Sequence, residues 1–255
     1  MTKIIMDINY NPFSLVGKTI LVTGASSGIG KATAIECSKL GARVIITARN
    51  EERLRETLGL MDGQGHEMIL ADQTIEEQVL SLLEQIPQLN GVVLCAGKGT
   101  TSPFPFSTRE KYDDIFNTNF FAPVELLRLL IKKKKITKES SVVFVSSIGG
   151  VESFQFGNGI YGASKAAINS TMKFCAKELA TKKIRVNSVN PGMVNTNLIQ
   201  GGTITEEQHK LDMEKYPLRR YGEPIDIAHG IIYLLSDASS WVTGHSLIID
   251  GGYTI

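Results

Sequence analysis

Short apolar, β-branched runs alternate along the chain with longer segments whose apolar residues recur every three or four positions. A period of two or a continuous apolar run indicates a strand, whereas a period near 3.6 indicates a helix. The predicted strands are 18–24, 43–49, 66–72, 91–97, 141–147, 185–192 and 246–252. The segments between the first six are helical by period or long enough to cross over, and 224–236 is a predicted helix. This alternation predicts a parallel sheet with helices on both faces.

No linker, low-complexity tract or repeat divides the 255 residues. We therefore predict one α/β domain over 1–255, with a doubly wound, mostly parallel sheet of seven strands and an N-terminal extension over 1–16. In such sheets, ligands bind at the carboxyl ends of the strands, near the point where the strand order reverses.

Composition narrows the functional classes. The net charge is +1 and the charged residues, 21% of the chain, are interspersed, which argues against nucleic-acid binding. No apolar run approaches the roughly 18 residues that span a membrane, and the N-terminus lacks the pattern of a signal peptide. Cys37, Cys95 and Cys175 lie far apart in apolar contexts, as reduced thiols of a cytoplasmic protein do.

A glycine-rich turn, TGASSGIG (23–30), follows the first strand and precedes a predicted helix. Gly24, Gly28 and Gly30 permit a tight turn and a close approach of backbone to a pyrophosphate, which the helix N-terminus attracts. Ordinary tight turns also use glycine, but this position between strand and helix favours a dinucleotide.

The end of the second strand indicates which dinucleotide binds. NAD-binding folds of this type place an acid there to bond the ribose hydroxyls, but the chain has Thr47-Ala48-Arg49-Asn50. A guanidinium can bind a 2′-phosphate by charge-assisted hydrogen bonds. The alternative is that Arg49 is an ordinary solvated residue. We predict NADP(H).

The sequence YGASK (161–165) begins a helical pattern with a lysine on the apolar stripe. The stripe consists of Tyr161, Lys165, Ile168, Met172, Cys175 and Leu179, and the predicted solvated side carries Asn169, Lys173 and Lys177. A buried ammonium requires a partner, a cleft or a chemical role, unless it extends to solvent at the helix end.

Ser147, at the end of the fifth predicted strand, supplies a second candidate group. A serine hydroxyl can hold a carbonyl oxygen, and a phenol can give that oxygen a proton. Because the ordinary pKa of tyrosine is about 10, the nearby Lys165 is expected to lower it. Tyr161, Ser147 and Lys165 therefore form a predicted catalytic group in a cofactor-filled cleft.

Together with NPGMVNT (190–196) and TGHSLIIDGG (243–252), these motifs resemble the short-chain dehydrogenase/reductase family from Gly17 to the C-terminus. The resemblance implies a Rossmann fold and an oxidoreductase that interconverts C=O and CH–OH with NADP(H). By this resemblance Tyr161 is the general acid/base, Ser147 orients the carbonyl, and Lys165 bonds the nicotinamide ribose and lowers the pKa of the phenol.

The resemblance also implies the cofactor contacts and the assembly. Asp72 matches the acid that contacts adenine, and Pro191 to Thr196 match the segment on the nicotinamide side. The predicted cofactor-binding residues are Gly24, Ser26, Ser27, Gly28, Ile29, Gly30, Arg49, Asn50, Asp72, Gln73, Ala96, Gly97, Tyr161, Lys165, Pro191, Gly192, Val194 and Thr196. A homotetramer is expected, with the helices of Asn119 and Tyr161 at one two-fold axis and helix 224–236 with the last strand at another.

Asn119 in FNTNF matches the fourth catalytic residue of the family, on the long helix after strand four. Pro123, four residues later, has no N–H, so the helical hydrogen bond to the Asn119 carbonyl cannot form. A free carbonyl at a kink could hold a water that links Lys165 to solvent. The alternative is a proline kink with a purely structural use.

Two departures from the family pattern stand out. The usual NNAG after strand four is Leu94-Cys95-Ala96-Gly97 here, so two asparagine side chains are lost while the backbone contacts can remain. The interval from Ser147 to Tyr161 is one residue longer than the commonest spacing, which leaves Ser146 as an alternative to Ser147.

The substrate stays open. Residues 198–217 correspond to the variable substrate lid of the family and single out no ligand. Overall similarity leans toward 3-oxoacyl-acyl-carrier-protein reductases, whose acidic partner is expected to meet Lys132 to Lys135. A sugar, steroid or small-ketone reductase and a non-catalytic NADP-sensing protein are the alternatives. The histidines are scattered and predict no metal site.

Overall fold

The computed structural model describes residues 10–196 and 206–255. Its sheet has the order β3-β2-β1-β4-β5-β6-β7, and each neighbouring pair is parallel. The strands are β1 (Thr19–Thr23), β2 (Arg43–Ala48), β3 (Glu67–Leu70), β4 (Leu89–Leu94), β5 (Ile136–Val145), β6 (Arg185–Pro191) and β7 (Ser246–Ile249). The predicted doubly wound sheet of seven strands is confirmed. The order reverses between β1 and β4, which places the expected ligand crevice at their carboxyl ends.

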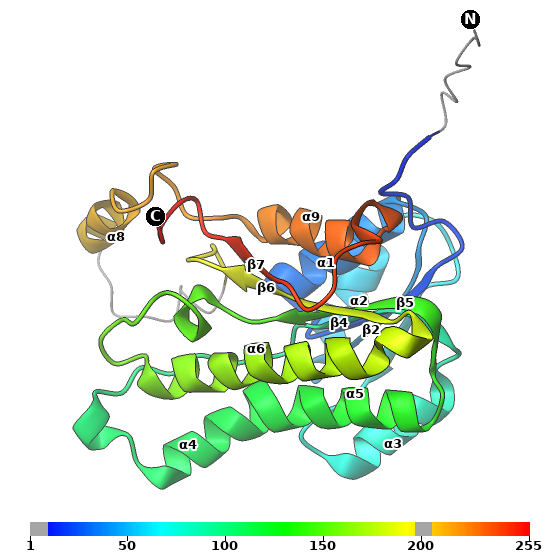
Figure 1. The fold of residues 1–255 in the computed structure, drawn as a ribbon, viewed down its shortest axis with the longest axis horizontal. Helices are drawn as coiled ribbons and strands as arrows, with labels where there is room; N and C mark the ends of the chain where they lie inside the picture. The colour runs from blue at the N-terminus through cyan, green and yellow to red at the C-terminus, as the bar shows by residue number, and fades with distance from the viewer. Residues whose placement is uncertain (1–9, 197–205) are drawn as a thin grey trace, which may run out of the picture.

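Helices cover both faces of this sheet, with α1, α2 and α9 on one side and α3, α5 and α6 on the other (Figure 1). The helices are α1 (Gly28–Lys39), α2 (Glu51–Gly59), α3 (Glu76–Gln85), α4 (Arg109–Phe116), α5 (Ala122–Lys132), α6 (Gly159–Leu179), α8 (Glu206–Met213) and α9 (Pro224–Leu235). A π-helical turn, Asn117–Phe121, joins α4 to α5. The helix predicted over 224–236 is therefore confirmed to within one residue.

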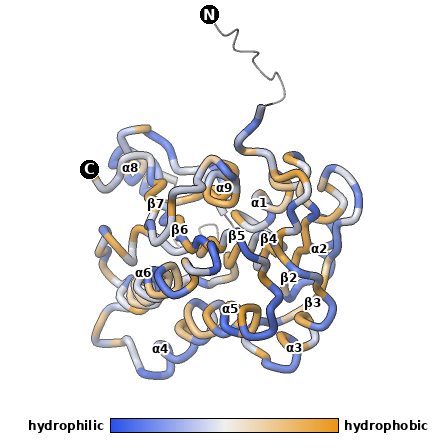
Figure 2. Tube along the Cα trace, turned by 45° about the vertical axis from the view of Figure 1, so that its right-hand side comes forward, coloured by the Kyte–Doolittle hydropathy of each residue, from blue (hydrophilic) through white to orange (hydrophobic). Residues whose placement is uncertain are grey.

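Two hydrophobic cores lie on the two faces of the sheet. Because successive strand residues point to opposite faces, Ile20 and Val22 join the core under α1 and α9, whereas Leu21 joins the core under α3, α5 and α6. The strands β1 and β2 are accordingly mostly apolar, and hydrophilic residues gather on the outer loops (Figure 2). Leu15, within the predicted N-terminal extension, is fully buried in the first of these cores.

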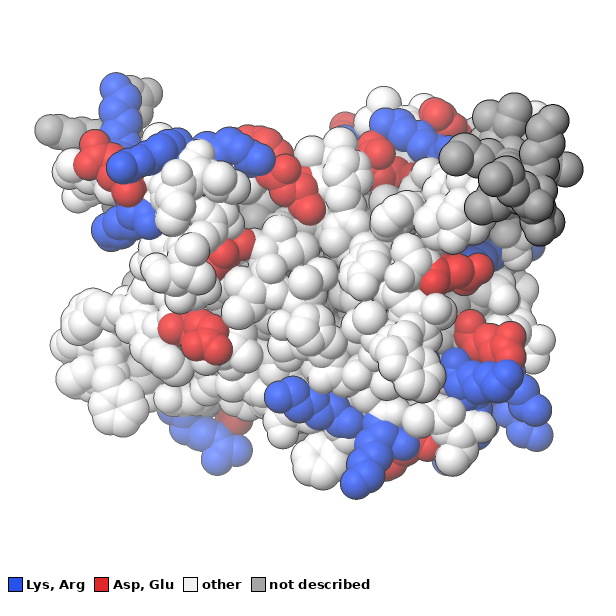
Figure 3. All heavy atoms as spheres, turned by 45° about the horizontal axis from the view of Figure 1, so that its top comes forward, with Lys and Arg blue, Asp and Glu red and all other residues white. Residues whose placement is uncertain are grey.

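The charged residues are mixed rather than segregated. On the face in Figure 3, basic and acidic side chains lie interspersed along the margins, and the band between them is mostly uncharged. No helix among the residues that the structure describes is long and apolar enough to cross a membrane.

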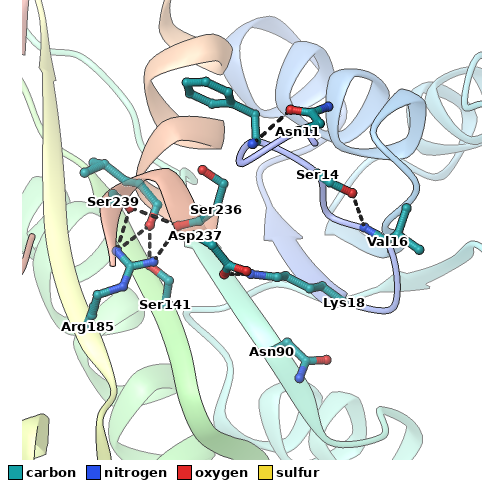
Figure 4. A network of polar contacts seen from close by, with 12 residues as sticks. Asn11, Ser14, Val16, Lys18, Asn90, Ser141, Arg185, Ser236, Asp237 and Ser239 are labelled. Carbon is teal, nitrogen blue, oxygen red and sulfur yellow. Dashed lines mark hydrogen bonds and ion pairs between the residues drawn. The ribbon is translucent and has the colours of Figure 1, made fainter. Parts of the chain in front are cut away.

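A polar network fixes the edge of the sheet at the amino ends of the strands (Figure 4). Arg185, the first residue of β6, donates hydrogen bonds to the carbonyls of Leu234 and Ser236 at 2.8 and 3.1 Å and to Ser239 Oγ at 2.8 Å. Lys18 Nζ lies 2.6 Å from Asp237 Oδ1 in the same region. The guanidinium thus binds the carbonyls at the end of α9, and this edge is held rigid opposite the predicted ligand crevice.

Candidate active site

The glycine-rich turn after β1 is packed against the end of β4. Gly24 has φ +66°, and a Cβ there would lie 2.8 Å from the Ala96 Cα, while a Cβ at Gly30 would lie 2.4 Å from the Gly24 carbonyl oxygen. Ser27, the N-cap of α1, makes no side-chain hydrogen bond to the helix. The side chain of the N-cap residue therefore does not occupy the N–H groups of the first turn of α1, where a pyrophosphate would bind.

The same turn faces the segment after β6. A Cβ at Gly28, where φ is +53°, would lie 3.1 Å from Thr196 Cγ2. The predicted contacts Ser26, Ser27 and Ile29 belong to the turn and the start of α1. The structure therefore brings the phosphate turn and the predicted nicotinamide-side segment together.

The groups after β2 and β3 form the predicted adenosine end. Arg49 is 71% exposed, and its Nη1 lies 3.6 Å from Asp72 Oδ2. Partial burial raises the pKa of the Asp72 carboxyl, but hydrogen bonds from Thr74 and the charge of Arg49 outweigh it, so this pKa lies below its ordinary value. Asn50 Oδ1 accepts a hydrogen bond from the Arg53 N–H at 2.9 Å and caps α2. Asn50 thus has a structural role in addition to its predicted contact.

Gln73 supplies an independent indication of a ligand. Its Oε1 is buried and is one of the described side-chain atoms without a hydrogen-bond partner. Buried polar atoms are rarely unsatisfied, and Gln73 follows Asp72 directly. An adenine amino group would satisfy this oxygen. The residues present therefore fit a dinucleotide.

Asn119 clamps the loop after β4. Its Oδ1 accepts from the Lys98 N–H at 2.9 Å, and its Nδ2 donates to the Lys98 carbonyl at 2.9 Å and to Ser164 Oγ at 3.2 Å. Asn119 lies within the π-helical turn, and Pro123 lies in the first turn of α5. The kink expected at the proline is thus a π-helical turn, a feature common at functional sites. The sequence did not reveal that the side chain ties this loop to α6.

Lys165 is confirmed as a buried lysine at the carboxyl end of β5. It is 5% exposed, and its Nζ donates to the Val145 carbonyl at 2.8 Å and lies 5.7 Å from the centroid of the Tyr161 ring. Burial lowers the pKa of Lys165 to about 8. A Cβ at Gly97 would lie 3.4 Å from this Nζ and 3.3 Å from Asn119 Oδ1, so the segment after β4 borders the lysine.

The tyrosine and serine meet beside this lysine. Burial raises the pKa of the Tyr161 phenol, and the hydrogen bond with the Ser147 hydroxyl offsets this only in part. The expected lowering of the phenol pKa is therefore wrong for this structure. The reason is that burial of the phenol outweighs the hydrogen bond with Ser147. Ser147 Oγ also accepts from the Gly149 N–H at 3.2 Å.

Ser146 points away from this group. It is 3% exposed, donates to the Lys165 carbonyl at 3.0 Å and accepts from Asn169 Nδ2 at 2.9 Å. This position behind α6 favours Ser147 over Ser146 as the residue that faces a substrate.

The assignment of Asn169 to the solvated side of the helix is wrong. Asn169 is buried. Its Nδ2 donates to Asn190 Oδ1 at 2.9 Å, and its Oδ1 accepts from Ser188 Oγ at 2.7 Å. The helix α6 buries a face wider than one stripe, and the polar character of the amide concealed this. The network links α6 to the end of β6, beside Pro191 and Gly192.

A cleft of about 580 Å³ lies beyond the end of β6. It is lined by Gln155, Phe156, Met193, Gln208, Leu211, Asp212, Lys215, Tyr221 and Tyr253. Part of the predicted lid, 206–213, forms α8, whereas 198–205 lie outside the described residues. Gln155 Nε2 donates to the Tyr253 hydroxyl at 3.1 Å, which joins the loop before α6 to the C-terminal segment. The sequence Phe154-Gln155-Phe156, shortly before YGASK, could have indicated that this loop lines the cleft, but it was not used in the prediction.

Comparison with known proteins identifies the family. A family model described as enoyl-(acyl carrier protein) reductase matches residues 24–254. The chain is 34% identical to a 3-oxoacyl-[acyl-carrier-protein] reductase FabG of Rickettsia felis, over 93% of this chain and 97% of that protein. It is 35% identical to a tropinone reductase homolog of Arabidopsis thaliana, over 95% and 92%. The chain belongs to the short-chain dehydrogenase/reductase family.

A solved structure of the same fold is the Pseudomonas aeruginosa RhlG/NADP active-site complex. Its TM-score is 0.88 at 27% identity, and the match covers 96% of this chain and 100% of that chain. This short-chain dehydrogenase/reductase is therefore an oxidoreductase with the Rossmann fold that the sequence predicted. The described residues hold no group of three or more histidine, cysteine or acidic side chains suited to a metal ion.

The departure at Cys95 has a structural consequence in this family member. The Cys95 and Ala96 N–H groups both donate to Thr23 Oγ1, at 3.0 and 3.3 Å, so the backbone stays in place without the two asparagines. Burial raises the pKa of the Cys95 thiol to about 12, although the nearby Lys165 charge opposes this. The thiol is therefore neutral and leaves the lysine as the charged group of the site.

Proposed function

We propose that the protein reduces a ketone to a secondary alcohol with NADPH, and that Tyr161 donates the proton. The observation that carries this proposal is the convergence of Tyr161, Ser147, Lys165 and Asn119 at the carboxyl ends of β4 and β5, beside the phosphate turn. A phenol held by a serine hydroxyl, next to a buried ammonium, is an acid for a carbonyl oxygen.

Each side chain has a distinct part in this reaction. When bound, the reduced nicotinamide supplies the hydride. The Ser147 hydroxyl orients the carbonyl, and the Tyr161 O–H gives its proton to the carbonyl oxygen. The phenol is in its protonated form at neutral pH, because burial raises its pKa above the ordinary value, and it can therefore act as the proton donor. Lys165 stabilises the phenolate that remains and would bind the nicotinamide ribose.

The choice of NADP(H) over NAD(H) rests on Arg49. No acid stands at the end of β2, and the Arg49 guanidinium is exposed, where a 2′-phosphate can reach it. The phosphates would lie on the N-terminus of α1, with Asp72 and Gln73 at the adenine and Pro191 to Thr196 on the nicotinamide side. The related RhlG complex contains NADP.

The substrate that we propose is a 3-oxoacyl group, as in the related FabG; a compact cyclic ketone is the second candidate, because a tropinone reductase homolog is equally similar. Docking of an acidic carrier on Lys132 to Lys135 is not supported by their position. They precede β5, whose ten residues at about 3.3 Å each put them roughly 30 Å from Val145 beside the site.

We further propose a cytoplasmic homotetramer. Phe121 and Phe174, at α5 and α6, are exposed, and β7 is an edge strand with Ile248 partly exposed. Unpaired edges and exposed apolar faces favour association. The three cysteines are free thiols, as in a reducing compartment. Sedimentation at micromolar concentration tests the assembly, and a monomer would contradict it.

Turnover of a panel of ketones by the purified protein tests the main proposal. We expect oxidation of NADPH with ethyl 3-oxobutanoate or its longer homologues, and slower oxidation of NADH. Oxidation of neither cofactor by any carbonyl in a panel that includes a sugar, a steroid and tropinone would overturn it.

A further inference from the structure

Four phenylalanine rings are exposed at the carboxyl edge of the sheet. Phe104 and Phe106, on the loop after β4, are 83% and 65% exposed, and Phe154 and Phe156, on the loop after β5, are each 88% exposed. We call these four residues the aromatic rim. Single exposed apolar residues are common on protein surfaces, but a group of large aromatic rings at one edge marks an interaction site.

The two loops of the aromatic rim are held together. The Ser102 N–H donates to the Gly157 carbonyl at 2.8 Å, and a Cβ at Gly157 would lie 2.9 Å from Thr101 Cγ2. Ser102 Oγ and Lys111 Nζ both donate to the Phe106 carbonyl, at 3.0 and 2.9 Å. Because the backbone of these loops is hydrogen-bonded, the rings are presented to solvent by an ordered scaffold.

The aromatic rim is continuous with the cleft beyond β6. Phe156 lines this cleft together with Met193 and Leu211, and it stands five residues before Tyr161. Met193 lies within the predicted nicotinamide segment, Pro191 to Thr196. The cleft therefore offers apolar side chains to the substituent of a ketone bound near the loop that precedes α6.

The charged groups of the cleft satisfy one another. Asp212 Oδ1 accepts from Lys215 Nζ at 2.9 Å, and Asp212 Oδ2 accepts from the Tyr221 hydroxyl at 2.9 Å. An alkyl chain would leave these bonds intact and would pack on the apolar lining residues Phe156, Met193 and Leu211. The cleft thus favours an apolar substituent over a sugar.

We propose that the aromatic rim and the cleft together select ketones with an extended apolar substituent, whose far end packs on Phe154 and Phe156. This proposal rests on the proposed function, and it names the class of substrate that this site takes: a carbonyl near one end of a long alkyl or aryl chain. A compact ketone could not reach the rim.

Two esters of different length measure this selection. The protein with saturating NADPH is assayed on ethyl 3-oxobutanoate and ethyl 3-oxodecanoate. Binding of the non-reducible ethyl butanoate and ethyl decanoate is measured separately by equilibrium dialysis in the presence of NADP⁺. The variants are Phe154→Ser, Phe156→Ser and the double variant. Trp241→Ser is the matched control, because Trp241 is 99% exposed and lies before the amino end of β7.

We expect kcat/KM about tenfold higher and Kd about tenfold lower for the long ester. The double variant should remove most of this difference and leave the thermal midpoint unchanged, and Trp241→Ser should preserve the difference. Equal binding of long and short esters, or a preference that survives in the double variant, would overturn the inference. So would loss of self-association in the double variant without any change in binding, since the rim would then contact a second copy.

The two proposals fail separately in this design. Length-dependent binding that the double variant removes, without oxidation of NADPH, would sink the proposed reduction and leave the binding class in place. Oxidation of NADPH at a rate that does not depend on chain length would support the proposed reduction and overturn the selection by the aromatic rim.

Discussion

The Lys165 ammonium lies 5.7 Å from the centroid of the Tyr161 ring and donates its hydrogen bond to the Val145 carbonyl at 2.8 Å. The two residues are one helical turn apart on α6, so the helix fixes their relation. Burial raises the pKa of the phenol and lowers that of the ammonium. A protonated phenol, Tyr161, and a buried amine, Lys165, therefore lie side by side at the end of β5.

Burial of the Lys165 amine makes the stability of the folded protein depend on pH. The pKa of Lys165 falls from an ordinary 10.5 to about 8 in the folded protein, so between these values the unfolded chain binds the proton and the folded chain does not. The free energy of unfolding therefore falls as the pH falls: the contribution of Lys165 is fully present above pH 10.5 and is lost by the time the pH has fallen through about 8. We predict that Lys165→Met raises the urea midpoint of unfolding relative to the parent, and that this increase is larger at pH 7 than at pH 10.

The exposed Lys173 on the same helix provides the control, and Lys173→Met should show no such dependence. A stability difference between Lys165→Met and the parent that is the same at both pH values would contradict the buried charge.

Arg49 sets the preference for NADPH in this account. Arg49→Ala should raise the KM for NADPH about tenfold while sparing NADH, because only NADPH carries the 2′-phosphate that the guanidinium would bind. Arg55→Ala, which removes an exposed arginine paired with Glu51 on α2, is the control. Steady-state kinetics with both cofactors decide the matter, and a parental preference for NADH would refute the assignment.

Gly30 permits the phosphate turn to close. A Cβ at this position meets the Gly24 carbonyl oxygen at 2.4 Å, whereas a Cβ at Gly59 meets nothing within 4 Å. Gly30→Ala should therefore weaken NADPH binding at least about tenfold, and Gly59→Ala should not. Fluorescence titration of NADPH measures both Kd values. Parental affinity in Gly30→Ala would show that the turn does not hold the cofactor.

The Asn169 network should contribute strongly to stability. Asn169→Leu leaves Ser188 and Asn190 with lost partners in a buried region, at a cost of about 2 kcal/mol or more in the free energy of unfolding. Because Asn169 also holds Ser146 behind Lys165, kcat should fall as well. Ser170→Ala, at the exposed next position, is the control. Urea denaturation of both variants is the measurement, and equal stability would contradict the network.

The sequence predicted the sheet because each strand carries an apolar run, and β1, β2 and β6 begin and end within one or two residues of expectation. It missed the first five residues of β5, where Thr137 to Ser140 are polar and the pairing with β4 shifts register between Leu89 and Gly91. Local polarity cannot reveal a strand that neighbouring pairing imposes.

The candidate site was predictable where its residues follow strand ends. Tyr161, Ser147 and Lys165 come together as the motif indicated. The Asn119 clamp on Lys98 and the burial of Asn169 were not predictable, because both depend on contacts between segments distant in sequence. The direction of the Tyr161 pKa shift likewise depends on how deeply the phenol is buried, which the spacing of the motif does not encode.

The most direct test of the central claim is kcat for Tyr161→Phe on an established ketone, measured beside the Kd for NADPH. The substitution removes only the hydroxyl that gives the proton, so kcat should fall at least about a thousandfold while the Kd stays within about twofold of the parent. Lys165→Ala should damage both quantities, because the lysine also bonds the ribose. Near-parental turnover by Tyr161→Phe would contradict the account and require another acid.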